Sequence, residues 1–223
     1  MPHARLRHMA SEFKKRLGFS RVVSLQGARQ TGKSFFAREI LPEMMAQARY
    51  ETFDREQTRR LAEAAPESFL KKHSDAHPLL IDEAQKVPAI FDAVKYEVDI
   101  DRRPGRFVLL GSTEFSREVQ IREALTGRLS RIRIYPFNVA EAAGLPANES
   151  KDPSLFRPKP RVSRGALMRH LERGGFPGIF HVREQNELEN LFQDWINLAV
   201  ERDIHQFKFL RPDTELARSL LRE

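Results

Sequence analysis

The fold is decided by the stretch RVVSLQGARQTGKSF, residues 21–35. An apolar run comes first, a turn punctuated by glycines follows, and the stretch ends in residues typical of the start of a helix. Its central part, residues 27–34, matches the pattern G-x-x-x-x-G-K-[ST], which cradles phosphate groups where it joins a strand to a helix. The flanking residues meet that condition, so we predict a strand, a phosphate-binding loop and a helix in this order.

Each part of the predicted loop has an expected task. Its backbone N–H groups, together with the positive end of the following helix, would face phosphate oxygens. Lys33 is expected to reach the β- and γ-phosphates, and the Ser34 hydroxyl to coordinate Mg²⁺. The residues expected to bind the nucleotide are Gly27, Ala28, Arg29, Gln30, Thr31, Gly32, Lys33, Ser34 and Phe35.

A second apolar run, LLI at residues 79–81, ends in the two acids Asp82 and Glu83. A buried strand of a parallel sheet would deliver these acids beside the phosphate loop. We therefore expect Asp82 to hold Mg²⁺, directly or through water, and Glu83 to polarise the attacking water. The alternative for Glu83 is an acid placed at a helix N-terminus because the helix dipole favours it there.

Hydrolysis of a nucleoside triphosphate also needs a polar group near the γ-phosphate and a cation for the charge of the transition state. Ser112 or Thr113, after the apolar run FVLLG, could sense the γ-phosphate. Arg128 is the expected arginine finger, because it precedes a predicted strand on the side where a neighbouring subunit would dock. A surface arginine without a role stays open, and so do three other fingers, Arg122, Arg131 and Arg202.

Apolar and helical segments alternate along the first two thirds of the chain. This alternation predicts an α/β fold, a P-loop NTPase three-layer sandwich around a mainly parallel five-stranded sheet, followed by a small helical region. The expected strands lie at 21–26, 50–54, 77–84, 106–112 and 131–137. Helices are expected at 33–47, at 55–72 with a break at Pro66, and at 88–101, 114–125, 165–173 and 185–207.

The same reading divides the chain into an N-terminal helix at 1–20, an ATPase core at 21–145, a proline-rich linker at 146–163 and a helical, lid-like region at 164–223. The 223 residues are 40% hydrophobic and contain no cysteine, which excludes a disulfide framework and a thiolate metal site. We find no apolar run long enough for a signal peptide or a membrane span, and expect a cytoplasmic protein without a membrane partner.

Positive charge is concentrated in two stretches of a chain with a net charge of +7. Residues 102–133 hold eight arginines against three glutamates, and residues 151–173 hold seven basic against two acidic residues. Such clusters favour phosphate, nucleic acid or an acidic protein partner, or they form a solvated face. We expect 102–133 to serve the nucleotide and a subunit interface, and 151–173 to be the better candidate for nucleic acid.

The motifs, in their order, resemble those of bacterial and archaeal AAA+-type ATPases over about residues 21–207. The phrases that carry the resemblance are GARQTGKS, YETFD, LLIDEAQKVP, DIDRRPGRFVLLGS, REALTGRLSRIRIYPFNVAE, GGFP and ERDI. The resemblance implies ATP rather than GTP, five parallel strands, and a homo-oligomer in which Arg128 acts in trans. Two departures are the segment after residue 111, where a longer apolar stretch is usual, and Gly178, where an acid is usual. Most members are longer, so the lid-like region is expected to be truncated.

The sequence therefore predicts Mg²⁺-dependent binding and hydrolysis of ATP, with catalysis assigned to Lys33, Glu83 and Arg128, metal binding to Ser34 and Asp82, and a nucleotide contact to Ser112. The task to which hydrolysis is coupled, regulatory or remodelling, is not readable from the motifs. Two alternatives remain at this point. One is a nucleotide-binding switch or scaffold that does not hydrolyse, and the other is a small-molecule phosphotransferase.

Overall fold

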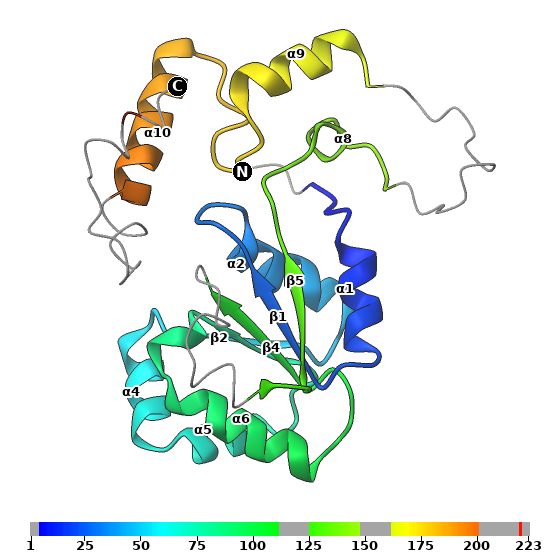
Figure 1. Ribbon diagram of the computed structural model, residues 1–223, viewed down its shortest axis with the longest axis vertical. Coiled ribbons are helices and arrows are strands. Elements are labelled where there is room, and N and C mark those ends of the chain that lie inside the picture. Colours follow the sequence, from blue (N-terminus) through cyan, green and yellow to red (C-terminus); the bar gives the residue numbers. More distant parts are fainter. Residues whose placement is uncertain (1–4, 112–124, 148–161, 201–218, 220–223) are drawn as a thin grey trace, which may run out of the picture. The chain divides into compact units, whose positions relative to one another are not determined.

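The structure, a computed structural model, describes residues 5–111, 125–147, 162–200 and 219 (Figure 1). Two compact units divide the chain. Leu6–Pro136 forms one, and Phe137–Glu223 together with Met1–Arg5 forms the other. The first unit contains a β-sheet, whereas the regular elements described in the second are helices.

A five-stranded sheet runs through the first unit in the order β2-β3-β4-β1-β5, and all of its pairings are parallel. The strands are β1 (Val22–Gln26), β2 (Arg49–Thr52), β3 (Leu79–Asp82), β4 (Phe107–Gly111) and β5 (Leu129–Arg133). Every residue of β1, β3 and β4 is buried, as continuous apolar runs in a parallel sheet predict, while the edge strands β2 and β5 are partly exposed. The predicted α/β fold is confirmed.

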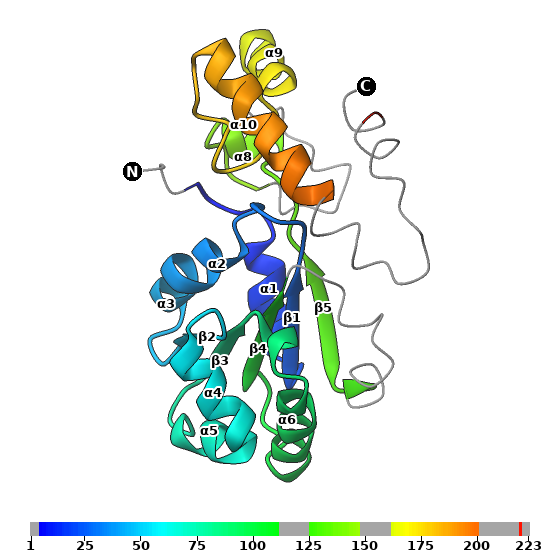
Figure 2. The same ribbon diagram turned by 90° about the vertical axis from the view of Figure 1, so that its left-hand side faces the viewer.

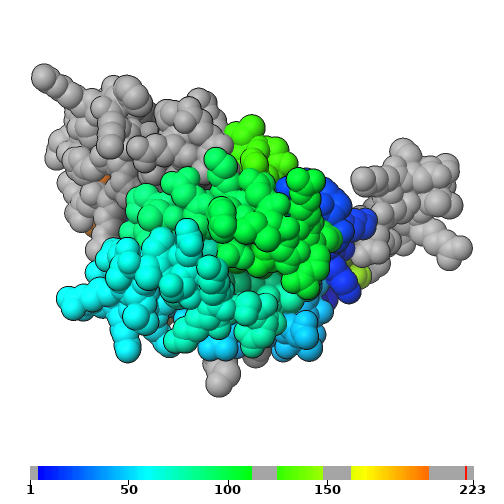
Figure 3. Space-filling view, turned by 90° about the horizontal axis from the view of Figure 1, so that it is seen from below, coloured from blue at the N-terminus to red at the C-terminus, as the bar shows by residue number. Residues whose placement is uncertain are grey.

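Helices cover both faces of this sheet (Figures 1 and 2). One face packs against α1 (Ala10–Leu17), α2 (Lys33–Phe35) and α3 (Leu41–Met44), and the other against α4 (Glu56–Ala64), α5 (Pro66–Lys72) and α6 (Ala89–Ile100). Figure 3 shows the outer side of α4 to α6 in cyan and green. Because side chains alternate along a strand, Leu79 and Ile81 join the core under α4 to α6, and Leu80 joins the core under α1 to α3.

The helix predicted at 33–47 is divided into three parts. Between α2 and α3 lies a π-helical segment, Phe36–Ile40, and the helix ends before Met45, whose backbone is extended. Pro42 lies in the first turn of α3 and has no N–H to donate to the carbonyl four residues before it. The proline therefore interrupts the regular hydrogen-bond ladder, and the preceding turn widens.

Strand β5 begins and ends earlier than the range 131–137 predicts. It pairs with β1 from Val22↔Leu129 to Gln26↔Arg133, and β1 leaves the sheet at the loop that follows Gln26. With no partner strand beyond this point and with Pro136 unable to donate, the ladder ends at Arg133. The helices predicted at 55–72 and 88–101 are present, whereas most of the one predicted at 114–125 lies outside the described residues.

The second unit contains α8 (Val139–Ala142), α9 (Arg164–Arg173) and α10 (Gln185–Leu198). Its small core is formed by Ile179, Val182 and Leu188, with Phe176, Leu191 and Phe192 packed against it. Helix α8, which we did not predict, begins with a capping box in which Asn138 and Glu141 bind each other's backbone N–H groups. No described helix of either unit is long and apolar enough to span a membrane.

The division between the units falls at Pro136–Phe137, nine residues before the expected end of the core at 145. The N–H of Phe137 donates to the carbonyl oxygen of Gly175 at 2.6 Å, and a Cβ on Gly175 would lie 2.1 Å from the Phe137 carbonyl oxygen. This close contact ties the residues after Pro136 to the helical unit. At the other end of the chain, α1 belongs to the sheet unit, because Phe13 and Leu17 are buried in its core.

Candidate nucleotide-binding site

The loop between β1 and α2 (Figure 1) has a backbone conformation that is unfavourable for most residues with a side chain. A Cβ on Gly27 would lie 2.3 Å from the carbonyl oxygen of Ile134, so only glycine fits there. Gly32 adopts φ +91° and Gln30, although not a glycine, adopts φ +61°. Left-handed conformations of this kind persist where the surroundings impose them, typically at functional loops. The loop is therefore held in one particular curved shape.

Polar side chains inside the loop maintain that shape. Thr31 is fully buried, and its hydroxyl donates to the carbonyl oxygen of Ala28 at 2.8 Å. Lys33 is only 6% exposed, and its ammonium donates to the carbonyl oxygens of Gly27 (2.8 Å) and Ala28 (2.7 Å). The predicted phosphate-binding cation is thus held within the loop whose N–H groups are expected to bind phosphate.

Asp82 lies at the end of β3, on the face of the sheet that carries the loop helix. Leu80 packs under α1 to α3, and Asp82, two residues later, points to the same face. The carboxylate is 2% exposed. One oxygen accepts the N–H of Glu83 at 2.9 Å, and the other accepts the hydroxyl of Tyr50 at 2.6 Å. Asp82 is therefore buried and held at both oxygens.

Tyr50, on β2, holds one of the two predicted metal ligands, Asp82, and the sequence did not reveal it. Burial, and then the hydrogen bond to Asp82, raise the pKa of the Tyr50 hydroxyl, while hydrogen bonding with Thr52 and Ser34 acts in the opposite direction. The Tyr50 hydroxyl thus lies at Asp82. The sequence alone carried no signal for this contact, because it depends on the register between β2 and β3, in which Thr52 pairs with Asp82.

These oxygen donors suit Mg²⁺. Within the described ranges there is no group of three or more His, Cys, Asp or Glu side chains that could hold a metal by themselves. Mg²⁺ commonly takes one or two protein oxygens and fills its octahedron with water and substrate phosphates. A buried carboxylate and a hydroxyl beside a phosphate-binding loop fit that pattern.

Glu83 follows Asp82 in a left-handed conformation, φ +54°, which is rare for this residue type. Burial, and then the charges of Asp82 and Asp54, raise the pKa of its carboxyl group. The amide of Gln85 donates to Glu83 at 2.5 Å. Glu83 precedes a single 3₁₀ turn, Ala84–Lys86, but its side chain makes no capping hydrogen bond. The helix-terminal alternative stays open, because Glu83 directly precedes this turn.

Asp54, in the loop after β2, lies close to Glu83. Lys86 forms an ion pair with it, and the Asp54 charge is among the causes that raise the pKa of Glu83. Electrostatic interactions thus connect the loop after β2 with the loop after β3, close to the predicted catalytic acid.

Arg128 lies at the opposite end of the sheet. Its carbonyl oxygen accepts the N–H of Val22, the first residue of β1, at 3.3 Å, whereas the phosphate loop follows the last. Five strand residues span about 16 Å, beyond the length of an arginine side chain. The guanidinium donates to both oxygens of Asp99, at 2.6 and 2.8 Å, and this lowers the pKa of Asp99. Arg128 therefore does not serve the loop of its own chain.

The remaining predicted finger and sensor residues are mostly not placed. Ser112, Thr113, Arg122 and Arg202 lie outside the described residues. Arg131, on edge strand β5, is exposed. These assignments stay predictions.

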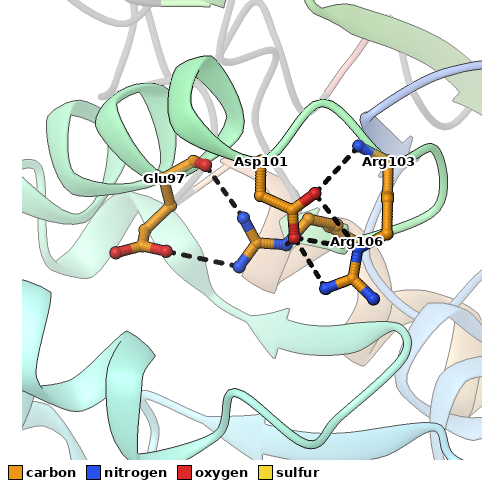
Figure 4. Close-up of polar contacts among 4 residues, drawn as sticks. All are labelled: Glu97, Asp101, Arg103 and Arg106. Carbon is orange, nitrogen blue, oxygen red and sulfur yellow. Dashed lines mark hydrogen bonds and ion pairs between the residues drawn. The ribbon is translucent and has the colours of Figure 1, made fainter.

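The basic stretch 102–133 is partly neutralised by acids at the end of α6 (Figure 4). Arg106 donates to the carbonyl oxygen and to a carboxylate oxygen of Glu97, at 2.9 and 3.3 Å. Arg103 forms a fork with Asp101, at 2.6 to 3.1 Å. Together with the pair Arg128–Asp99, these contacts show that three arginines of the stretch have acidic partners within the same unit. The expectation that the stretch serves the nucleotide and a subunit interface stays a prediction, and these three arginines already have acidic partners.

The loop, the acidic strand end and the parallel sheet with its order β2-β3-β4-β1-β5 define a P-loop nucleotide-binding protein of the AAA+ ATPase class. A family model described as an AAA domain matches residues 19–143, more than half of the chain. The chain therefore belongs to the AAA-domain family.

Two mycobacterial proteins are similar over almost the whole chain. Rv2008c of Mycobacterium tuberculosis and Mb2031c of Mycobacterium bovis are each 27% identical over 219 residues, which is 96% of this chain but 43% of the relative. The chain thus spans less than half the length of these relatives.

Solved structures show only a distant likeness. AMPPCP-bound DnaA from Aquifex aeolicus has 13% identity and a TM-score of 0.47, with 95% of this chain and 73% of that chain covered. The Aeropyrum pernix ORC1 protein in complex with DNA has 15% identity and a TM-score of 0.46, with 92% and 69% covered. Likenesses at this level support no statement about ligands or partners.

Proposed function

We propose that this chain binds ATP together with Mg²⁺ and hydrolyses it. The observation that carries the proposal is the grouping at the carboxyl edge of the sheet, where Lys33 is held within a strained loop and Asp82 is buried and held by the hydroxyl of Tyr50. A glycine-rich turn without a ligand would not need a buried ammonium and a buried carboxylate on the same face.

The residues divide the work between binding and reaction. The loop N–H groups and Lys33 would bind the phosphates, and Ser34 and Asp82 would hold Mg²⁺, which neutralises charge on the phosphoryl oxygens. Glu83 would accept a proton from the attacking water. Its raised pKa makes the carboxylate a stronger base than an exposed glutamate.

Phosphate release from ATP tests this division in the wild type, Lys33→Ala and Glu83→Gln. We expect Lys33→Ala to lose nucleotide binding, and Glu83→Gln to retain binding while turnover falls at least about 100-fold, the scale of general-base catalysis. Turnover unchanged in Glu83→Gln would remove the role of Glu83. Binding without turnover in the wild type would favour the switch or scaffold, and transfer of phosphate to an added small molecule would favour the phosphotransferase.

We also propose that Arg128 acts on the site of a second copy. Its place at the amino edge of the sheet supports this, since the residue faces away from its own loop. Mixing Arg128→Ala with Glu83→Gln tests it, because the first variant keeps an intact site and the second an intact finger. We expect the mixture to regain activity that neither variant has alone. No recovery at any protein concentration would leave Arg128 as the structural partner of Asp99.

The process driven by hydrolysis is a separate proposal, and we assign it only as a regulatory or remodelling task. Stretch 151–173 stays our candidate for a nucleic-acid or protein surface, and its described part carries Arg164, Arg169 and Arg173 on α9. Charge reversal at Arg157, Lys159 and Arg161 tests it. Binding to duplex DNA that shows no dependence on salt, or that survives this reversal, would end the nucleic-acid proposal.

A further inference from the structure

We propose that Tyr50 is a positioning residue for the magnesium site: its hydroxyl fixes the Asp82 carboxylate. This inference rests on the proposed Mg²⁺–ATP binding, but it concerns a residue from a strand that contributes no other group to the metal. Tyr50 begins the phrase YETFD, to which the sequence assigned no role at the site.

The first argument is the way in which Asp82 is held. A carboxylate on a strand end can rotate about its terminal bond, which presents its oxygens to a metal in many directions. Here the N–H of Glu83 holds one oxygen at 2.9 Å, and the Tyr50 hydroxyl holds the other at 2.6 Å. One donor lies on β2 and the other directly after β3, so together they fix the plane of the carboxylate. Each oxygen keeps a second lone pair for the metal or for a metal-bound water.

The second argument is the chemistry of Mg²⁺, which demands a nearly ideal octahedron and loses its waters reluctantly. Misdirected ligands therefore cost more affinity for Mg²⁺ than for a more adaptable cation. Groups that hydrogen-bond to metal ligands commonly change metal affinity about 10- to 100-fold when they are removed. Because the Tyr50 hydroxyl holds one oxygen of Asp82, its loss would leave this predicted ligand less well directed.

The third argument is the position of the ring. Tyr50 packs against the core under α1 to α3 and is half-buried, while Tyr96 and Tyr135 are 53% and 64% exposed. The ring is thus anchored in the core and carries its hydroxyl to the rim of the site, as an amphipathic aromatic side chain can. Tyr50→Phe removes the hydroxyl and keeps this packing. Tyr96→Phe offers a matched control on α6, outside the site.

The test is a titration with Mg²⁺ of the binding of a fluorescent ATP analogue, with EDTA as the metal-free reference. We expect Tyr50→Phe to need at least about tenfold more Mg²⁺ for half-maximal enhancement of binding. Affinity in EDTA should stay within twofold of the wild type, and Tyr96→Phe should match the wild type in both measurements. A midpoint for Mg²⁺ within twofold of the wild type overturns the proposal, even where Tyr50→Phe melts at a lower temperature, because that result describes a purely structural residue.

A second comparison tests whether Tyr50 acts through Asp82. If Tyr50 acts through Asp82, adding Tyr50→Phe to Asp82→Asn leaves the Mg²⁺ midpoint of Asp82→Asn almost unchanged, and independent effects of the two changes contradict this. The measurement needs no turnover. Mg²⁺-dependent binding without hydrolysis in the wild type would therefore end the ATPase proposal and leave this one standing. Binding that ignores Mg²⁺ in the wild type would end both.

Discussion

The two edges of the sheet hold their charged groups in opposite ways. At the carboxyl edge, Lys33 and Asp82 are almost completely buried, and Gln30 and Glu83 adopt left-handed backbone conformations. At the amino edge, acids at the end of α6 pair with arginines of the following segments (Figure 4). Burial and strain concentrate at the edge where the chain's own site lies, and ion pairs that neutralise the end of α6 lie at the other edge.

Two buried side-chain atoms near the site also lack a hydrogen-bond partner among the described residues: the Gln26 amide nitrogen, directly before the phosphate loop, and the Gln85 amide oxygen, beside Glu83. Each such group costs about 1–3 kcal/mol when nothing compensates it. Other such atoms, for example on His73, lie elsewhere, so this cost is not confined to the carboxyl edge.

The largest expected effect comes from a substitution that forces the backbone at the carboxyl edge to move. Gly27→Ala places a Cβ 2.3 Å from the Ile134 carbonyl oxygen, so either the loop or the chain after β5 must shift. A displacement of about 1 Å commonly costs about 100-fold in function, and overpacking about 1–3 kcal/mol in stability. We expect both losses, measured by ATP binding and urea unfolding. Gly178→Ala, whose Cβ meets no atom within 4 Å, should show neither, and wild-type ATP affinity in Gly27→Ala would contradict the tight fit.

A smaller effect is expected at the amino edge, where a substitution should lower the free energy of unfolding without changing ATP affinity. Arg106 is 13% exposed at its side chain, donates to the Glu97 carbonyl oxygen, and stacks over Phe107 with its guanidinium carbon 5.0 Å from the ring centre. Arg106→Ala leaves the end of α6 uncompensated, so we expect it to lower the free energy of unfolding by about 2 kcal/mol. ATP affinity should stay within twofold.

Arg103→Ala is the control within the same cluster, because Arg103 is 70% exposed at its side chain. Exposed ion pairs contribute about 0–1 kcal/mol, so the urea midpoint should move much less than in Arg106→Ala. Equal losses in the two variants would show that the network acts as a unit. A large change in ATP affinity with either variant would contradict the separation of the two edges.

Much of the sheet and of its carboxyl edge could be predicted from the sequence. The apolar runs of β1, β3 and β4 identify strands buried on both faces, and the loop pattern places Lys33 and Ser34 at the start of a helix. The acids after residues 79–81 follow from the same logic. These features are local, since each depends on neighbours within about ten residues.

What could not be predicted depends on pairs that lie far apart in the chain. Tyr50 meets Asp82 because β2 and β3 are adjacent, and Arg128 meets Asp99 because α6 ends where β5 begins. Charge counting could not show which arginines of 102–133 have acidic partners. The unit boundary at Pro136 likewise depends on the contact between Phe137 and Gly175, 38 residues later.

The smallest expected effect is the pH dependence of the stability that Asp101 contributes at the amino edge. Hydrogen bonds from Arg103 lower the pKa of Asp101 to about 2, against an ordinary value of 3.8. A lowered pKa in the folded state contributes stability that is complete above the unfolded value and is lost as pH falls through the folded value. Because Arg103 is exposed, the contribution is about 0.5 kcal/mol.

Asp101→Asn should therefore be slightly less stable than the wild type at pH 7, and the difference should shrink between about pH 4 and pH 2. Urea midpoints at several pH values measure this, with Asp92→Asn, an exposed carboxyl on α6, as the control. A difference that stays constant down to pH 2 would show that Asp101 stabilises the turn through its shape and not its charge. The charges at the amino edge would then contribute less than their pairing implies, and the contrast between the two edges would rest on burial and backbone strain alone.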